Sequence, residues 1–310
     1  MFTITFGGMS MSGHDSAKAV YYALAANFGI AIAKSIAALM TRSGSMLAEA
    51  IHSFADCSNQ LLLLFGMKRA QRPPDKNHPL GYGNELYFWS FIVAVLLFSI
   101  GGLFSIYEGI HKLQVHEPIQ KVWLAIGVLG FSIVLESFSL LGALTEINKI
   151  RKGKGFFAWL KHTRSSELIV VLGEDIAAIL GLVTAFIFVI LSHVLNNPVY
   201  DAMGSICIGA ILLIVSLFLI IRMRDLLIGK SADPDIQKAI LNHIESDPLI
   251  EDIFNIITIQ IGPYVMLAGK IKIKGKVDIH TACQTINRME SSLKKQLPQI
   301  RWSFIEPDIK

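Results

Sequence analysis

Six long blocks of apolar residues constrain this 310-residue chain more than any other feature of its sequence. A helix needs about 20 apolar residues to cross the hydrocarbon core of a bilayer. Only 17% of the residues are charged, against about 25% in a typical soluble domain, and the mean hydropathy is +0.53. An α-helical membrane protein is therefore predicted. Its six spans cover residues 18–40, 45–67, 86–111, 121–146, 166–192 and 199–221.

Basic residues near the ends of these blocks predict the orientation, because Lys and Arg concentrate on the cytoplasmic side of a membrane. One side carries Lys68, Arg69, Arg72, Lys76, Lys149, Arg151, Lys152, Lys154, Lys161, Arg164, Arg222 and Arg224. The other side carries only Arg42, Lys112 and Lys121. Both termini are therefore expected in the cytoplasm, which implies the inner (plasma) membrane if the source is bacterial. Residues 1–16 lack the pattern of a removable signal peptide.

The composition becomes that of a soluble domain after the last block. We expect a tail at 1–17, a six-helix membrane domain at 18–222 and a cytoplasmic domain at 223–310. In the last domain the patterns predict helix, strand, strand, helix and strand, at 234–246, 251–261, 265–274, 278–296 and 300–305. That order is typical of a ferredoxin-like α+β module. The net charge of +4 is modest and does not indicate a nucleic-acid partner.

The second block contains three ionisable residues on one face of a helix: Glu49, His52 and Asp56. Such groups are costly in hydrocarbon and usually serve a function there. An imidazole nitrogen and a carboxylate oxygen are ligands that zinc accepts. We therefore expect His52 and Asp56 to bind a metal ion, with Glu49 as an accessory.

The fifth block adds Glu174 and Asp175, of which we favour Asp175 for the inward-facing role. Counted from the helix ends, Asp56 lies roughly 18 Å from one membrane face and Asp175 roughly 13 Å from the other. In a core about 30 Å thick, both then lie near the middle, where transporters bind their ions. A purely structural hydrogen-bond network between the helices is the alternative.

Three further polar residues lie inside the predicted spans: Asn27, Lys34 and Glu136. Lys34 is a candidate counter-charge for the carboxylates. Glu136 is a candidate accessory ligand or proton carrier, and Asn27 is a candidate ligand. A structural role is an equally open interpretation for all three.

Four motifs stand out along the chain: SGSMLAEAIHSFADCSNQ (43–60), DKNHPLGYGN (75–84), LGEDIAAILGL (172–182) and FIEPD (304–308). In these motifs the chain resembles the cation diffusion facilitator family. The first and third are most similar to the branch of mitochondrial zinc-transporter-like proteins of animals. The resemblance implies six spans, cytoplasmic termini, a ferredoxin-like C-terminal domain and a homodimer that exchanges metal ions for protons.

The resemblance also implies which residues hold metal. Two transport ligands from the second span match His52 and Asp56, and the aspartate of an HxxxD motif on the fifth matches Asp175. Val171 stands where that motif has its histidine, so a further ligand must come from Glu174, Asn27, water or another helix. A second site, in the loop after the second span, matches Asp75 and His78.

Tyr82 occupies the third ligand position of that loop site, so Asp75 and His78 are open to a ligand role or to an ordinary solvated-loop role. In the transport site, a shell with fewer nitrogens relaxes the preference for zinc toward Mn²⁺ or Fe²⁺. Zinc remains the expected cargo by family frequency, and no organic cofactor is expected.

Metal efflux in exchange for protons is the function that these residues predict. The carboxylates must be ionised and the imidazole neutral to bind metal, so binding releases protons. Two other classes stay open. One is a membrane scaffold or regulator that no longer transports. The other is a membrane-embedded metalloenzyme, which the lack of a nucleophile–base pair in the sequence disfavours.

Overall fold

The computed structural model describes residues 13–115, 118–151, 153–275 and 277–309, with side chains from residue 27 onward. Residues 1–12 of the predicted tail lie outside the described residues, and the first helix already begins at Gly13. The chain divides into two compact units. The first contains residues 1–65, 89–155 and 167–222, and the second contains 66–88, 156–166 and 223–310.

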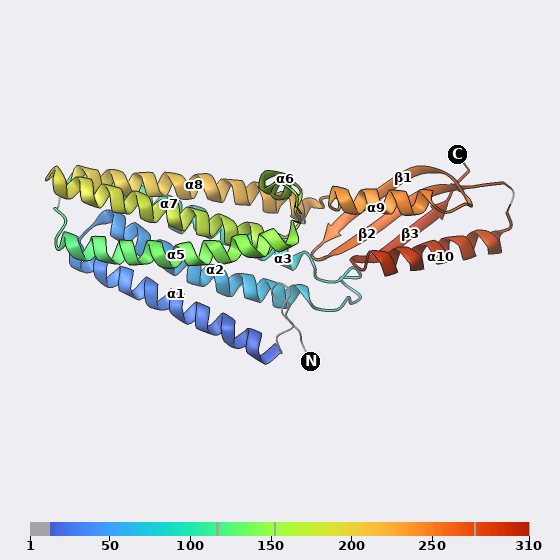
Figure 1. Cartoon of the computed structure of the whole chain (residues 1–310), viewed down its shortest axis with the longest axis horizontal. Helices are drawn as coiled ribbons and strands as arrows, with labels where there is room; N and C mark the ends of the chain where they lie inside the picture. The colour runs from blue at the N-terminus through green and yellow to red at the C-terminus, as the bar shows by residue number, and fades with distance from the viewer. Residues whose placement is uncertain (1–12, 116–117, 152, 276, 310) are drawn as a thin grey trace. The chain divides into compact units, whose positions relative to one another are not determined.

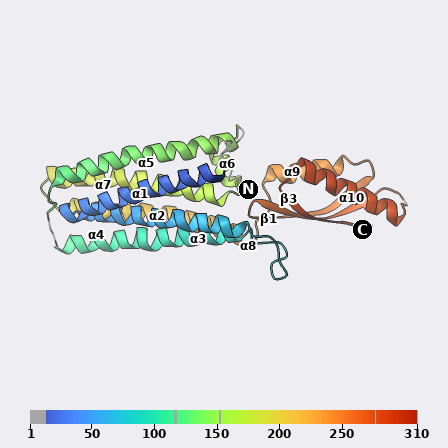
Figure 2. The ribbon, with the colours of Figure 1, turned by 90° about the horizontal axis from the view of Figure 1, so that it is seen from below.

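Long helices run side by side along the first unit (Figures 1 and 2). They are α1 (Gly13–Thr41), α2 (Gly44–Ala70), α5 (Val122–Ile150), α7 (Ser166–Val194), α8 (Val199–Ile228) and a composite helix over Glu85–Val115. These correspond to the six predicted spans, each starting or ending a few residues away from its predicted boundary. The protein is thus an α-helical membrane protein of six transmembrane helices.

Four of these helices are long and apolar enough to cross a bilayer by length and composition alone: Glu85–Val115, α5, α7 and α8. The described part of α1 contributes a shorter apolar helix, Asn27–Thr41. The ionisable residues of α2 lower the hydropathy of that helix, although its length is sufficient. Glu49 and His52 of this helix are fully buried within the protein, as is usual for ionisable residues inside a membrane domain.

The composite helix contains a π-helical segment that the sequence did not reveal. It consists of α3 (Glu85–Leu96), the π segment η1 (Leu97–Leu103) and α4 (Phe104–Val115). Two glycines let this helix approach α8 closely: a Cβ atom on Gly209 would lie 2.7 Å from the carbonyl oxygen of Gly102. Small residues at such crossings allow backbones in a membrane to pack directly.

Asp201, near the start of α8, holds the start of α2. Its carboxylate accepts hydrogen bonds from the Ser43 hydroxyl at 2.6 Å and from the backbone N–H groups of Gly44 and Ser45, at 2.6 and 3.2 Å. The first N–H groups of a helix have no partner within it, and a negative charge there is favourable. Asp201 therefore fixes the position of the N-terminal end of α2, which lies five residues before Glu49.

The C-terminal part of the chain folds as predicted into a small sheet with both helices on one face (Figure 2). The helices are α9 (Pro234–Glu245) and α10 (Ile279–Gln296), and the strands are β1 (Ile250–Ile261), β2 (Tyr264–Ile273) and β3 (Ile300–Pro307). β2 is central, antiparallel to β1 and parallel to β3. This is the ferredoxin-like α+β domain.

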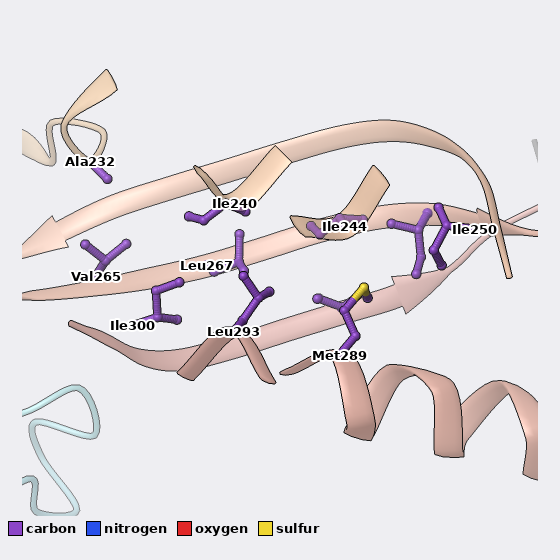
Figure 3. Close-up of a cluster of buried hydrophobic side chains, with 11 residues drawn as sticks. Ala232, Ile240, Ile244, Ile250, Val265, Leu267, Met289, Leu293 and Ile300 are labelled. Carbon is purple, nitrogen blue, oxygen red and sulfur yellow. The ribbon is translucent and has the colours of Figure 1, made fainter. Parts of the chain in front are cut away.

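Alternate residues of the strands fill the core between sheet and helices (Figure 3). Val265 and Leu267 of β2 are fully buried there, with Ile240 and Ile244 of α9 and Leu293 of α10. Asp233 and Asp278 cap the two helices by accepting backbone N–H groups of the first turns.

Within the second unit, the start of α3 contacts the turn between β1 and β2. The fully buried Tyr87 donates a hydrogen bond to the carbonyl oxygen of Gly262 at 2.9 Å. The backbones touch as well, since a Cβ on Gly83 would lie 2.6 Å from the carbonyl oxygen of Ile261. Arg164, in the short connection before α7, donates to the carbonyl oxygen of Ser231 at 2.8 Å. α6 (Phe156–His162), which the sequence analysis did not predict, lies in the same unit.

Candidate metal centre

The predicted face of α2 is buried inside the helix bundle. Glu49 and His52 have no exposed surface, and the side chain of Asp56 is 17% exposed. The spacings of three and four residues stack these side chains on one side of the helix. His52 Nε2 lies 3.6 Å from Asp56 Oδ2. The ionisable groups thus face protein.

Glu174 and Asp175 of α7 both reach the same cavity, although only one was favoured for an inward role. Glu174 Oε1 accepts a hydrogen bond from Asn59 Nδ2 of α2 at 2.6 Å. Asp175 Oδ1 accepts one from Ser139 Oγ of α5 at 3.2 Å. Neighbouring side chains on a helix diverge by about 100°. The two carboxylates can share one cavity because it lies where α7 faces two helices, α2 and α5.

This cavity offers about 60 Å³ to the centres of water-sized molecules. That is enough for a small cation and a few waters, since one water needs only about 10–15 Å³. Its polar lining is made of oxygen-bearing side chains from α1, α2, α5 and α7. They are Asn27, Ser53, Asp56, Gln60, Glu136, Ser139, Glu174 and Asp175. The cavity thus brings together Asp56, Glu174, Asp175, Asn27 and Glu136 from the sequence analysis.

Several buried oxygens of this region have no hydrogen-bond partner among the described residues. They include Asp56 Oδ1 and Asp175 Oδ2. Buried polar atoms are nearly always satisfied in folded proteins, and an unpaired carboxylate oxygen is costly. A proton or a cation would satisfy these oxygens. The arrangement is therefore suited to exchange between a metal ion and protons.

The imidazole of His52 lies outside the lining of this cavity. Both of its ring nitrogens are buried without a hydrogen-bond partner among the described residues. Among all the residues that the structure describes, no three His, Cys, Asp or Glu side chains are grouped closely enough to hold a metal ion. A complete shell would require the side chains around the cavity to draw together, or the His52 ring to turn into the cavity.

Lys34 of α1 forms an ion pair with Glu49 rather than with the carboxylates of the cavity. Its Nζ lies 3.3 Å from Glu49 Oε2 and donates to Ser53 Oγ at 2.8 Å. Lys34 is thus the counter-charge of Glu49, the predicted accessory residue, and not of Asp56, Glu174 or Asp175.

Sequence reasoning missed this pairing and the contributions of Ser53 and Ser139. Ser139 follows Glu136 by three residues, so shared helical spacing was the available signal.

Asp75 and His78 lie together in the exposed loop after α2. Asp75 accepts hydrogen bonds from the backbone N–H groups of Asn77 and His78 and from the Tyr82 hydroxyl, the last at 2.6 Å. The Tyr82 hydrogen bond, followed by the backbone ones, holds the pKa of Asp75 below its ordinary value. The His78 ring packs against the Tyr82 ring at a tilt of 35°, with 4.3 Å between centroids. The Asp75 carboxylate therefore organises the loop, with Tyr82 as its partner.

Comparison with known proteins gives concordant matches. Residues 20–228 match the cation efflux transmembrane domain. The chain is 37% identical over 259 residues to the proton-coupled zinc antiporter SLC30A9, mitochondrial, of Xenopus laevis, covering 83% of this chain and 45% of that protein. It is 33% identical over 268 residues to the human protein of the same name, covering 86% and 46%.

A plant protein, metal tolerance protein C4 of Arabidopsis thaliana, is 32% identical over 276 residues, covering 88% of this chain and 59% of that protein. The chain therefore spans about half the length of these three curated relatives.

Proposed function

The chain belongs to the cation efflux family, a family of transporters rather than enzymes, and from that premise we propose that it exchanges a divalent metal ion for protons. The cavity between α2, α5 and α7 is the proposed binding site. Asp56 and Asp175 hold the cargo, with Glu174 and Glu136 as further carboxylate ligands. The names of the animal relatives, which call them proton-coupled zinc antiporters, support zinc as the first cargo.

One observation carries the proposal: buried carboxylate oxygens of two helices, which have no donor among the described residues, converge on one small cavity in the membrane domain. A cation that enters must displace protons from any protonated carboxylate, so binding and proton release are linked. When the ion leaves, protons restore the neutral form, which is cheaper to bury. Each cycle then moves metal one way and protons the other.

The charge distribution supports one orientation of the chain in the membrane. Basic residues lie mainly at the cytoplasmic ends of the spans, by the positive-inside rule, and we infer that both termini lie on that side. The ferredoxin-like domain would then be cytoplasmic. Its proposed role is to join two copies into a homodimer, as the family resemblance implies. The loop at Asp75 and His78 stays a candidate second metal site, in which Tyr82 already engages the aspartate.

Manganese or iron is a second candidate cargo, favoured by the donor set of the cavity. Every polar side chain in its lining offers oxygen, as carboxylate, amide or hydroxyl, while His52 lies outside it. Harder ions such as Mn²⁺ and Fe²⁺ prefer oxygen ligands, whereas zinc accepts nitrogen and oxygen alike. Rotation of the His52 ring into the cavity would add a nitrogen ligand and favour zinc.

Flux into proteoliposomes tests the proposal. Purified protein is reconstituted, and uptake of Zn²⁺, Mn²⁺, Fe²⁺ and Co²⁺ is followed with and without an imposed pH gradient. We expect uptake to require the gradient and to be abolished by Asp56→Ala. Glu146→Gln is the matched control, because Glu146 is a carboxylate of α5 that pairs with Lys149 away from the cavity. Equal uptake without any gradient, or normal uptake by Asp56→Ala, would contradict the proposal.

A further inference from the structure

Lys34 is an unusual lysine because it lies wholly inside the membrane domain. Its side chain has no exposed surface, and no other lysine or arginine of the described residues is buried to that degree. A charged group in such a place is retained only with a partner and usually marks a function. Its partners are Glu49 at 3.3 Å and the Ser53 hydroxyl at 2.8 Å.

Glu49 occupies a niche that a glycine creates. A Cβ atom on Gly181 of α7 would lie only 2.5 Å from Glu49 Oε1, so any larger residue there would displace the carboxylate. Oε1 has no hydrogen-bond partner among the described residues, while Oε2 faces Lys34. The Lys34 ammonium thus pairs with one oxygen of this carboxylate, and the other oxygen can still accept a hydrogen bond or contact a cation.

The Lys34–Glu49 pair is adjacent to the proposed transport site. Ser53, to which Lys34 donates, lines the cavity together with Asp56. Glu49 precedes His52 by three residues, and neither nitrogen of that imidazole has a hydrogen-bond partner among the residues that the structure describes. Free of Lys34, Glu49 and His52 would together offer a carboxylate and an imidazole one helical turn apart. These are two ligands that zinc accepts.

We propose that Lys34 is a positioning residue, a tethered counter-cation that keeps Glu49 out of the ligand set of the transported metal. The inference rests on the proposed function. The ammonium satisfies the charge of Glu49, so an arriving divalent cation gains nothing from that carboxylate and is repelled by Lys34. The affinity is thereby held low enough for release, which every transport site requires.

The alternative is that the Lys34–Glu49 ion pair only holds α1 and α2 together. The two roles differ in one measurable respect. If the ion pair is only structural, its loss destabilises the fold and weakens any metal binding. Loss of a tethered counter-cation leaves Glu49 as an unpaired buried carboxylate, which a metal ion can then satisfy. Only the second role predicts tighter binding in the absence of Lys34.

Zinc titrations of the purified full-length protein, by competition with a chromophoric chelator, test the inference. We expect Lys34→Met to lower the Kd for Zn²⁺ on the order of tenfold, the size of a typical coupling between sites. The turnover in proteoliposomes should fall at the same time, because release slows. Lys34→Arg keeps the ion pair and should behave as wild type. Lys34→Met/Glu49→Gln removes the unpaired carboxylate and should restore the Kd.

Lys112→Met is the matched control, since Lys112 donates to the carbonyl oxygen of Arg42 away from the cavity. An unchanged or weaker Kd in folded Lys34→Met, or a double variant that stays tight, would overturn the inference. If Lys34→Met does not fold, Gly181→Ala is measured instead, because it displaces the Glu49 carboxylate with Lys34 intact. A tightened Kd supports the inference there, and an unchanged one overturns it. A wild-type protein that binds no zinc would instead count against the proposed function.

Discussion

At the scale of single residues, the carboxylates of the cavity differ in which of their oxygens have donors. Glu174 Oε1 has the Asn59 amide, and Asp175 Oδ1 has the Ser139 hydroxyl. Asp56 Oδ1 and Asp175 Oδ2 have no donor among the described residues. Donors hold a carboxylate in place, whereas oxygens without donors are available to an ion. Asp56 and Asp175 therefore suit direct contact with the cargo.

The Asn59–Glu174 hydrogen bond leads to a prediction about stability. Asn59→Ala leaves the Glu174 carboxylate buried without its donor, which should lower the free energy of unfolding by about 1–3 kcal/mol. Denaturation in detergent micelles measures the change. Adding Glu174→Leu to Asn59→Ala should recover part of the loss, because the buried carboxylate that lost its Asn59 donor is then removed as well. Strictly additive losses in the double variant would show that the two side chains do not interact.

The loop aspartate gives a prediction about pH. Because hydrogen bonds, first of all from Tyr82, hold the pKa of Asp75 below its ordinary value, they stabilise the loop above that ordinary value. The contribution disappears as the pH falls through the lowered pKa. Tyr82→Phe should move the pKa of Asp75 up toward its ordinary value. A carboxyl ¹³C titration of Asp-labelled protein measures it, with Asp75→Asn to assign the signal. An identical titration in both proteins would mean that the Tyr82 bond does not form.

At the scale of elements, α2 owes its position to a residue far away in the sequence. The carboxylate of Asp201 in α8 accepts three hydrogen bonds at the start of α2, two of them from backbone N–H groups. The pair of helices is thus joined at one end, and the ionisable face of α2 follows within two turns. Helix caps of this kind act on stability and on orientation together.

Asp201→Ala should therefore destabilise the protein by about 1–2 kcal/mol or more, the range of a strong helix cap. Asp201→Asn keeps one acceptor oxygen and should lose less. Thermal unfolding in detergent, followed by circular dichroism, compares the two variants. The zinc Kd of the variants that remain folded should change little, since Asp201 does not line the cavity. A ranking in which Asn is worse than Ala would contradict the capping role.

Sequence patterns predicted most elements because each depends on local information. Apolar length indicated the spans, and alternation with turn residues indicated the order of helices and strands in the C-terminal domain. The π segment at Leu97–Leu103 could not be predicted, since its residues are as apolar as those around it. α6 is a helix of only 7 residues, which is too short for helical periodicity to reveal it.

Side-chain pairings were less predictable, because they depend on how each helix is rotated against its neighbours. Spacing correctly placed Glu49, His52 and Asp56 on one face. It could not tell that Ser53 and Asp56 line the cavity while His52 does not, or that Lys34 pairs with Glu49. Whether these residues form the transport site stays a prediction, and so do the proposed domain boundaries.

At the scale of the whole molecule, the second unit combines the C-terminal domain with segments next to the spans. Gly83 and Gly262 touch through their backbones, and Gly262 has φ of +57°. Gly83→Ala should destabilise this unit, because the new Cβ would collide with the carbonyl of Ile261. Gly155→Ala is the control, since nothing lies within 4 Å of its Cβ position. Limited proteolysis after Lys and Arg in 66–88 should be faster in Gly83→Ala alone. Equal rates in both variants would contradict the contact.

The account depends on metal and protons competing for the carboxylates of one cavity. Calorimetric titration of Zn²⁺ into the purified protein, in buffers of different ionisation enthalpy, measures that competition directly. We predict that wild type releases protons as zinc binds, and that Asp56→Asn/Asp175→Asn loses both the binding and the release. Undiminished binding by that variant, or heats in wild type that do not vary with the buffer, would contradict the account.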